Sequence, residues 1–276
     1  MTDVVGKRTL ITGAASGIGK LLAQRLADAG ARLVLWDIDA AGLTQLETEF
    51  AAAGHEVDTY TCDLTSRDTI AAVAAQTLAD GGPIDILINN AGIVSGKTLL
   101  DISEEEIERT FQVNTLALFW TVRAFLPAMM ERNSGHIVTV ASAAGLAGTA
   151  KLTDYCSSKF AAVGFDESLR LELKKLGSNV VTTVVCPFYI NTGMFDGVKT
   201  RFSWLLPIMK PDAVVKRILR AIRKDRRRLI MPWFIYTGWP IRLLPVSWFD
   251  ALMAILGLSH RKEDFRGGSG KTGSDN

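Results

Sequence analysis

RTLITGAASGIG, residues 8–19, is the stretch of sequence that decides the fold. Its first five residues form a short apolar run that predicts a buried strand, and a helical pattern through Ala29 follows the glycines. Strand, glycine turn and helix in this order suit a dinucleotide, because glycines let the backbone approach a pyrophosphate and the helix N-terminus offers free N–H groups. Turns also carry glycine for backbone reasons alone. The predicted cofactor contacts are Gly13, Ser16, Gly17, Ile18 and Gly19.

Further apolar runs alternate with helical patterns along the chain. The predicted strands are residues 32–36, 56–61, 83–88, 136–141 and 180–186, and the helical patterns are 40–53, 66–79, 104–131 and 155–176. This alternation predicts an α/β fold with a single Rossmann-type, doubly wound parallel sheet and helices on both faces. Ligands of such sheets bind beyond the carboxyl ends of the strands. Those ends carry Gly13, Asp37, Asp63, Asn90, Ser142 and Pro187, which predicts one composite site.

Asp37 closes the second predicted strand, about 20 residues after the glycine loop. A carboxylate there can bind the adenosine ribose hydroxyls and repel a 2′-phosphate, and no basic residue lies inside the loop. We therefore predict NAD as the preferred cofactor, with NADP as the alternative. Asp37 could instead cap the helix at 40–53, and Asp63 could contact the adenine edge or cap the helix at 66–79. Small and amide residues after the fourth strand, Asn90, Ala91 and Gly92, suit close packing against a flat cofactor.

Tyr155 and Lys159 lie one helical turn apart. A free tyrosine titrates near about 10, and a nearby ammonium lowers that pKa, so the pair could supply a general acid/base. The same spacing is also common in ordinary amphipathic helices. Asn114 lies among apolar residues, where its amide must be hydrogen-bonded, either as a core residue or as part of a site.

With these residues identified, residues 6–194 resemble the short-chain dehydrogenase/reductase family. The resemblance rests on TGAASGIG (12–19), Asp63, NNAG (89–92), Ser142, and Tyr155 with Lys159, with Tyr155 standing 13 positions after Ser142. It implies that Tyr155 moves the hydroxyl proton, Lys159 lowers the tyrosine pKa and holds the nicotinamide ribose, and Ser142 binds the substrate oxygen. Asn114 would hold a water that links Lys159 to solvent. Further implied cofactor contacts are Leu64, Pro187, Ile190 and Thr192.

Phe188 stands where the family usually has glycine, so we expect it to narrow the site beside the nicotinamide. CPFYINTGMF (186–195) and LIMPW (229–233) resemble the retinol dehydrogenase and type 11 17β-hydroxysteroid dehydrogenase group. This implies a hydrophobic alcohol substrate, retinol-, steroid- or lipid-like, that is interconverted with its carbonyl. Two alternatives are an NADPH-preferring carbonyl reductase on the same fold and a non-catalytic NAD-binding protein. The presence of all four implied catalytic side chains argues against the second.

Composition narrows the remaining possibilities. The 31 basic and 29 acidic residues nearly balance, which gives no reason to expect a nucleic-acid partner. The scattered Cys62, Cys156 and Cys186 indicate reduced thiols and neither a disulfide framework nor a metal site. No hydrophobic run follows the N-terminus, so we expect no signal peptide or N-terminal anchor. The expected location is cytoplasmic, with peripheral membrane contact left open.

We divide the chain into residues 1–228, an NAD-binding domain with a substrate loop at 188–210, a hydrophobic extension at 229–258, and a polar tail at 259–276 predicted to be disordered. The extension is rich in tryptophan, and prolines interrupt it, so it is no spanning helix. A basic helical pattern at 212–228 precedes it. Together these segments predict a membrane contact, a lid or a subunit interface. The helices at 111–130 and 155–176 could pair in a homodimer or homotetramer.

Overall fold

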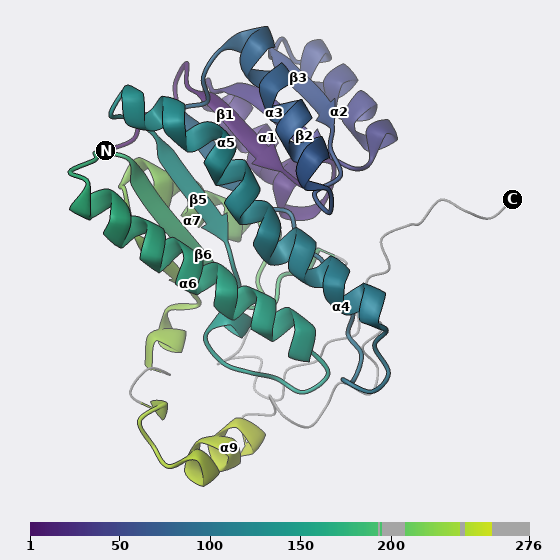
Figure 1. Ribbon diagram of the computed structural model, residues 1–276, viewed down its shortest axis with the longest axis vertical. Helices are drawn as coiled ribbons and strands as arrows, with labels where there is room; N and C mark the ends of the chain where they lie inside the picture. The colour runs from purple at the N-terminus through teal and green to yellow at the C-terminus, as the bar shows by residue number, and fades with distance from the viewer. Residues whose placement is uncertain (193, 195–207, 238–240, 256–276) are drawn as a thin grey trace, which may run out of the picture.

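The computed structural model describes residues 1–192, 194, 208–237 and 241–255 (Figure 1). Within these residues, seven parallel strands form one sheet in the spatial order β3-β2-β1-β4-β5-β6-β7. The strands are β1 (Arg8–Thr12), β2 (Arg32–Asp37), β3 (Val57–Thr61), β4 (Ile86–Asn89), β5 (His136–Val140), β6 (Val181–Pro187) and β7 (Arg228–Met231). The predicted parallel sheet is therefore confirmed.

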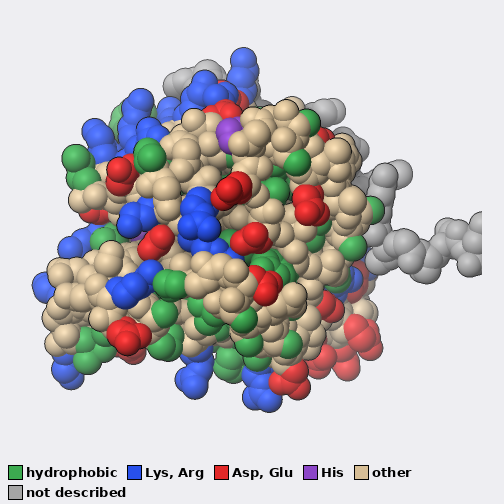
Figure 2. Space-filling view, turned by 90° about the horizontal axis from the view of Figure 1, so that it is seen from above, with side chains coloured by type: hydrophobic (Ala, Val, Ile, Leu, Met, Phe, Trp, Pro, Cys, Tyr) green, Lys and Arg blue, Asp and Glu red, His purple; other side chains and the backbone are tan. Residues whose placement is uncertain are grey.

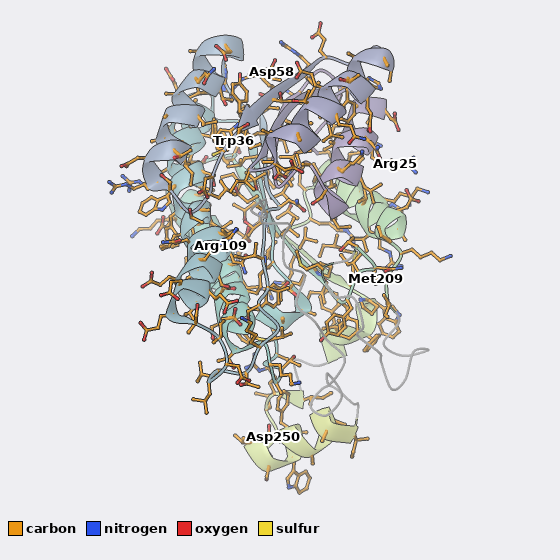
Figure 3. All side chains as sticks on the ribbon, turned by 90° about the vertical axis from the view of Figure 1, so that its right-hand side faces the viewer. Arg25, Trp36, Asp58, Arg109, Met209 and Asp250 are labelled. Atoms are coloured by element: carbon orange, nitrogen blue, oxygen red, sulfur yellow. The ribbon has the colours of Figure 1, made fainter. Side chains whose placement is uncertain are left out.

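Helices cover both faces of this sheet, as the edge-on view in Figure 3 shows. They are α1 (Gly17–Asp28), α2 (Ala40–Ala52), α3 (Arg67–Gly81), α4 (Glu104–Phe111), α5 (Ala117–Glu131), α6 (Thr153–Lys175), α7 (Pro211–Arg223) and α9 (Val246–Ile255). Helices α1, α2 and α7 share one hydrophobic core with the sheet, and α3, α5 and α6 share the other. The fold is doubly wound, as predicted.

Successive strand residues enter opposite cores. In β1, Leu10 packs with α3 and α5, whereas Ile11 packs with α1 and α7. Both side chains are fully buried, so the strand has no solvent-facing side. This explains why the parallel strands read as continuous apolar runs in the sequence.

Strand β7 was not predicted. It pairs with β6 in parallel, with Val185 opposite Leu229, so residues 229–231 of the expected hydrophobic extension belong to the sheet. The helical pattern assigned to 212–228 ends at Arg223, and Asp225 has a positive φ of 50° that cannot continue a right-handed helix. A four-residue strand is too short to show a periodicity of its own.

The long helix predicted at 104–131 is interrupted. A π-helical turn, η1 (Gln112–Leu116), separates α4 from α5 and contains Asn114. Such turns are rare and often lie at functional sites. Residues 104–131 are long and apolar enough to cross a membrane by length and composition alone, and an 18-residue window within them has a mean hydropathy of 1.3. Half of that window is buried, however, and α5 packs on the sheet through Val122 and Phe125, which accounts for its composition.

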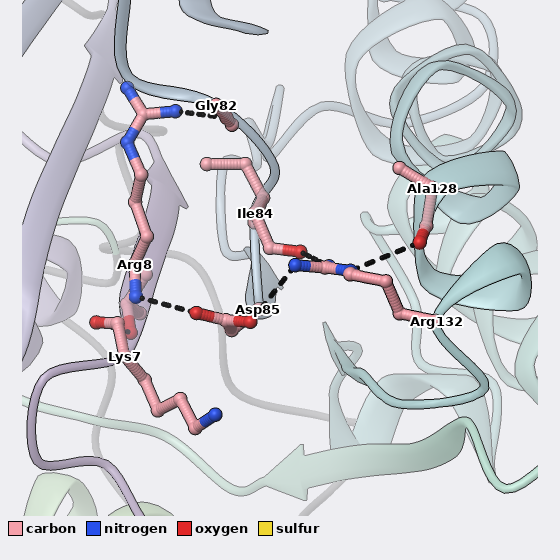
Figure 4. A network of polar contacts seen from close by, with 8 residues as sticks. Lys7, Arg8, Gly82, Ile84, Asp85, Ala128 and Arg132 are labelled. Carbon is pink, nitrogen blue, oxygen red and sulfur yellow. Dashed lines mark hydrogen bonds and ion pairs between the residues drawn. The ribbon is translucent and has the colours of Figure 1, made fainter.

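A polar network fixes the amino end of the sheet (Figure 4). The buried Arg8 donates from Nη1 to the carbonyl oxygens of Thr77 and Gly82, and its Nη2 lies 2.8 Å from Asp58 Oδ2. Its main-chain N–H donates to Asp85, which also pairs with Arg132 at 3.3 Å. Figure 2 views this end of the molecule, with Lys and Arg side chains at its rim and Asp and Glu among them. The network ties β1, β4 and α5 together far from the carboxyl ends of the strands.

The C-terminal segment lies at the other end of the molecule, at the bottom of Figure 1. After β7, the 3-10 turn η3 (Trp233–Thr237) packs through Ile235 against a buried cluster that includes Leu146. Arg242 Nη1 donates to the Leu146 carbonyl oxygen at 2.7 Å, and its guanidinium lies 5.2 Å from the Phe160 ring. The segment is therefore attached near the carboxyl ends of β5 and β6.

The basic face of α7 does not adjoin this segment. Helix α7 begins beside the carboxyl end of β6, where Ile190 bridges to Met209, and runs back to Asp225. Asp225 accepts a hydrogen bond from the Thr2 N–H and lies 3.9 Å from His136, the first residue of β5. Thus the last turn of α7 lies at the amino end of the sheet. The last turn of the basic helix α7 and the segment that carries η3 and α9 therefore lie toward opposite ends of the sheet. The predicted tail, Trp239 and residues 195–207 of the predicted substrate loop lie outside the described residues.

Asp166, in α6, makes the stability of this fold depend on pH. Its carboxyl is buried, accepts one long hydrogen bond of 3.4 Å from Thr182, and has Oδ1 without a partner among the described residues. Burial raises its pKa from 3.8 to about 7. Because the folded pKa lies above the unfolded one, the stabilisation is full below pH 4 and is lost as pH rises through 7.

We therefore expect Asp166→Asn to gain stability relative to the wild type as pH rises from 4.5 to 8. The expected change in the difference between their free energies of unfolding is on the order of 2 kcal/mol. Urea denaturation of both proteins at the two pH values measures it. A difference that stays constant across this range would show that Asp166 keeps an ordinary pKa.

Candidate active site

The glycine loop between β1 and α1 is closely packed and leads into the N-terminus of α1. Gly13 and Gly17 have positive φ values of 65° and 53°. A Cβ on Gly19 would lie only 1.9 Å from the Gly13 carbonyl oxygen, so this helical position is restricted to glycine. Ser16 is the extended N-cap residue of α1, and its side chain makes no capping hydrogen bond. The first N–H groups of α1 are thus without a side-chain cap, which fits the binding of a pyrophosphate.

Asn90 fastens the end of β4 to this loop. Its Nδ2 donates to the carbonyl oxygens of Thr12 and Gly13 at 3.0 and 3.1 Å, and the N–H groups of Asn90 and Ala91 donate to Thr12 Oγ1. A Cβ on Gly13 would lie 2.8 Å from Ala91 Cα. The predicted contacts Gly13, Asn90 and Ala91 therefore form one rigid unit.

Asp37 lies against the glycine loop. Its Oδ2 accepts a hydrogen bond from the Ala15 N–H at 2.8 Å, and its Oδ1 accepts one from the Asp39 N–H. Helix α2 is capped by Asp39, which accepts from the Gly42 N–H at 3.0 Å. The alternative that Asp37 caps this helix is therefore wrong. The carboxylate at the end of β2 stands beside the loop that would hold the cofactor.

Asp63 does not cap its helix either. It accepts hydrogen bonds from the backbone N–H and hydroxyl of Thr65, while Ser66 caps α3 through the Thr69 N–H. Leu64 packs against the core shared with α3 and α5. Asp63 and Leu64 lie at the carboxyl end of β3, at the same edge of the sheet as Asp37.

Tyr155, Ser142 and Lys159 meet at the carboxyl end of β5. Helix α6 carries Tyr155 and Lys159, and Ser142 precedes the short 3-10 turn η2 (Ala143–Gly145). Ser142 and Tyr155 are hydrogen-bonded through their side chains. Lys159 Nζ donates to the Val140 carbonyl oxygen at 3.0 Å and lies 5.8 Å from the centre of the Tyr155 ring. Tyr155 and Lys159 are each only 4% exposed, so this is a preorganised and largely dehydrated group.

Burial governs the titration of this pair. It raises the pKa of Tyr155 to about 12, and the hydrogen bond with Ser142 opposes the rise. Burial also lowers the pKa of Lys159 to about 8. In the protein without cofactor, burial therefore outweighs any lowering of the tyrosine pKa by the neighbouring ammonium, and the role implied for Lys159 in lowering this pKa stays a prediction. In the protein without cofactor, Tyr155 is a proton donor at neutral pH.

Asn114 is a satisfied buried amide. Its Oδ1 accepts from the Ile93 N–H at 2.8 Å, and its Nδ2 donates to the Ile93 carbonyl oxygen and to Ser158 Oγ. A Cβ on Gly92 would lie 3.2 Å from Lys159 Nζ and 3.3 Å from Asn114 Oδ1, so these three residues are neighbours. The amide fixes the loop after β4 to α6. Both N–H groups of the Asn114 side chain are used within the protein. The water that the resemblance implies at Asn114 stays a prediction.

Residues at and after the end of β6 also lie beside the glycine loop and the cluster that contains Tyr155. Pro187 ends β6, and Thr192 lies beside the glycine loop, because a Cβ on Gly17 would be 3.7 Å from Thr192 Cβ. Phe188 and Ile190 pack against the core shared with α1 and α7, whereas Tyr189 packs against Tyr155. That Phe188 narrows the site beside the nicotinamide stays a prediction, and our reading of the sequence missed Tyr189, which packs against the cluster that contains Tyr155. Strand-like alternation continued past Pro187 would have identified it.

The other titratable groups show no second centre within the described residues. No group of three His, Cys, Asp or Glu side chains there is arranged to hold a metal ion. Cys62, Cys156 and Cys186 are buried and form no disulfide with one another, and burial raises the pKa of Cys62 and of Cys186 to about 12.

Known proteins with similar sequences are short-chain dehydrogenases. The family described as short chain dehydrogenase matches residues 7–201. Mouse epidermal retinol dehydrogenase 2 is 44% identical over 98% of this chain and 88% of its own length. Short-chain dehydrogenase/reductase family 16C member 6 of Bos taurus is 48% identical over 86% of this chain and 75% of its own. Human retinol dehydrogenase 10 is 44% identical, with coverage of 85% and 77%.

Solved structures with bound dinucleotides share the fold. A short-chain dehydrogenase/reductase from Burkholderia phymatum in complex with NAD has a TM-score of 0.81 and 28% identity, covering 90% of this chain and 96% of that one. A metagenomic short-chain oxidoreductase in complex with NADP has a TM-score of 0.69 and 32% identity, with coverage of 83% and 96%. Similar structures therefore hold either dinucleotide.

Proposed function

Because this chain belongs to the short-chain dehydrogenase family and is an NAD(P)-dependent alcohol–carbonyl oxidoreductase, we propose that its substrates are hydrophobic, lipid-like alcohols and that NAD is its preferred cofactor. The observation that carries the proposal is the meeting of Ser142, Tyr155 and Lys159 beside the glycine loop. The side chains packed around Tyr155 are mainly apolar, among them Val94 and Leu152. The names of the similar retinol dehydrogenases point to the same substrate class.

Each residue of the site has a separate role in the interconversion of alcohol and carbonyl. The bound dinucleotide supplies the hydride donor or acceptor. Tyr155 gives its phenolic proton to the substrate oxygen in carbonyl reduction and takes it back in alcohol oxidation. Ser142, hydrogen-bonded to Tyr155, helps to bind the same oxygen as charge develops on it. Lys159, whose Nζ donates to the Val140 carbonyl oxygen, would hold the nicotinamide ribose.

A panel of alcohols tests the substrate class. NADH formation from NAD is measured with retinol, a 17β-hydroxysteroid, a long-chain fatty alcohol and a short polar alcohol. We expect turnover of at least one of the three apolar alcohols and little of the polar one. Turnover of the short polar alcohol alone would overturn the lipid-alcohol proposal, and no turnover of any despite tight NAD binding would favour a non-catalytic NAD-binding protein.

Asp37 is proposed to set the preference for NAD over NADP. We expect Asp37→Ala to shift the ratio of the two dissociation constants toward NADP by about 100-fold, because it removes a charge repelled by the 2′-phosphate and a partner of the ribose. Fluorescence titration with NADH and NADPH measures both constants. Asp39→Ala is the matched control, since it removes a nearby carboxylate that caps α2, and it should leave the ratio unchanged. Tighter NADPH than NADH binding by the wild type would favour the NADPH-preferring reductase.

We also propose peripheral membrane contact through the C-terminal segment. Trp233, Leu243 and Trp248 are 74%, 88% and 67% exposed. They belong to the segment of η3 and α9, which Arg242 attaches to Leu146 near the carboxyl end of β5. Tryptophan favours the interface between lipid and water. We expect the wild type to pellet with liposomes and a Trp233→Ser/Trp248→Ser variant to lose most of this binding. Arg220→Ser/Arg223→Ser is the control, since α7 ends at the opposite end of the sheet. A wild type that fails to pellet with liposomes, whether or not they contain anionic lipid, would contradict the proposed membrane contact.

We also propose that the protein is cytoplasmic and that it forms a homodimer or homotetramer. Leu116, Phe119 and Leu171 are large apolar side chains on the outer side of η1, α5 and α6, and each is more than 40% exposed. An exposed apolar face on two neighbouring helices supports pairing with a second copy. Light scattering after size-exclusion chromatography measures the mass, and a monomer at all concentrations would exclude a homodimer or homotetramer.

A further inference from the structure

Tyr189 is held in place by the sheet. The Phe188 N–H donates to the Met231 carbonyl oxygen at the end of β7, and the Met209 N–H donates to the Tyr189 carbonyl oxygen, both at 2.8 Å. Ile190 then forms a parallel bridge with Met209. The backbone of Tyr189 therefore continues β6 with partners on both sides, so the position of its side chain is fixed by the strands.

The Tyr189 side chain packs against the buried cluster that contains Tyr155. It packs on the cluster of Val94, Leu152, Tyr155 and Cys156, and its ring meets the edge of the Phe188 ring at 4.6 Å. The phenol is close enough to Tyr155 and to Cys156 for each of them to raise its pKa, after burial, the largest cause. A bulky aromatic ring thus borders the place where Tyr155 and Ser142 must receive the substrate oxygen.

The carbon that bears this oxygen must come within about 3–3.5 Å of its reaction partner, so its substituents are confined. A primary alcohol carries one large substituent on that carbon, whereas a secondary alcohol carries two. We propose that Tyr189 occupies the space of the second substituent and restricts the enzyme to primary alcohols with a long apolar chain. This rests on the proposed function, and it decides between the primary and secondary alcohols that the sequence left open.

Dodecan-1-ol and dodecan-2-ol test this selection, because they differ in whether the reacting carbon carries a second carbon substituent. One methyl group in a tight apolar site is worth about 10–200-fold in kcat/KM, so the wild type should favour dodecan-1-ol by at least about 10-fold. Tyr189→Ala should lower this ratio by about 10-fold or more, mainly through turnover of dodecan-2-ol. Tyr189→Phe should keep the wild-type ratio, because it keeps the ring.

Several results would overturn the inference. A wild type that prefers dodecan-2-ol, or a Tyr189→Ala variant with an unchanged ratio, would show that Tyr189 does not border the reacting carbon. Tyr189→Leu replaces Tyr189→Ala if the latter fails to fold. If neither long alcohol reacts, ethanol and propan-2-ol test Tyr189 by the same comparison, and failure of all four alcohols overturns the restriction to primary alcohols with a long apolar chain. Turnover of retinol or of the 17β-hydroxysteroid would still support the lipid-alcohol function, so the two failures are distinguished.

Discussion

Tyr155→Phe is expected to lower kcat for alcohol oxidation and for carbonyl reduction by about 10²–10⁴-fold, the usual contribution of a positioned general acid/base. The substitution keeps the ring that packs with Val94 and Leu152 and removes only the hydroxyl that is bonded to Ser142. Folding should therefore change little, by about 1 kcal/mol for the lost hydrogen bond. Dinucleotide affinity should be retained, because the glycine loop and Asp37 are untouched.

Steady-state kinetics in both directions and a titration with NADH measure this result. Tyr60→Phe is the matched control, since it removes the same atom from a tyrosine on β3 whose hydroxyl bonds to Asp80 at 2.8 Å. It should leave kcat unchanged. A Tyr155→Phe enzyme with more than a tenth of the wild-type kcat would mean that another group moves the proton.

The two directions should also respond differently to pH. Because the pKa of Tyr155 is raised to about 12, the phenol is present through the neutral range and can donate its proton in carbonyl reduction. Alcohol oxidation needs the phenolate, so its rate should rise with pH as long as proton transfer limits the rate. A bound oxidised nicotinamide carries a positive charge that would favour the phenolate and shift this rise to lower pH.

The sequence predicted which residues meet at the site more reliably than it predicted their pKa values. Apolar runs with no polar alternation predicted strands buried on both faces, and the carboxyl ends of those strands placed Gly13, Asp37 and Ser142 at one edge. The spacing of Tyr155 and Lys159 predicted their proximity correctly. The same spacing could not predict the net shift in the tyrosine pKa without cofactor, because burial, which depends on the whole fold, is the largest cause and raises this pKa.

Local features without a periodic signal were beyond prediction. The π-helical turn at Asn114 inserts its extra residue inside a pattern that reads as one continuous helix. Strand β7 has four residues, and its pairing with β6 comes from tertiary contacts. The choice of Asp39 over Asp37 as the cap of α2 depends on a difference of two residues, which is within the usual uncertainty of a helix boundary.

Gly19→Ala is expected to abolish dinucleotide binding, with a loss of at least about 100-fold in affinity, and to lower the stability of the protein. The new Cβ would lie 1.9 Å from the Gly13 carbonyl oxygen and 2.8 Å from Asn90 Nδ2. Neither neighbour can move freely, because Asn90 Nδ2 donates to that same oxygen and to the Thr12 carbonyl oxygen. Relief of the clash must open the glycine loop or separate it from β4.

Gly164→Ala separates this effect from the general cost or gain of an added methyl group. Gly164 lies in α6 and is exposed, and a Cβ added to it would have no atom within 4 Å outside its own helix and chain neighbours. Alanine there should stabilise the fold by about 1 kcal/mol through its higher helix propensity and leave NADH affinity unchanged. Gly19→Ala also replaces a helical glycine, yet overpacking against fixed backbone usually costs about 1–3 kcal/mol and sometimes more. Thermal unfolding and NADH titration of both variants measure the contrast. A Gly19→Ala protein that binds NADH as the wild type does would mean that the phosphates do not lie on this loop, and the assignment of the cofactor site would fall with it.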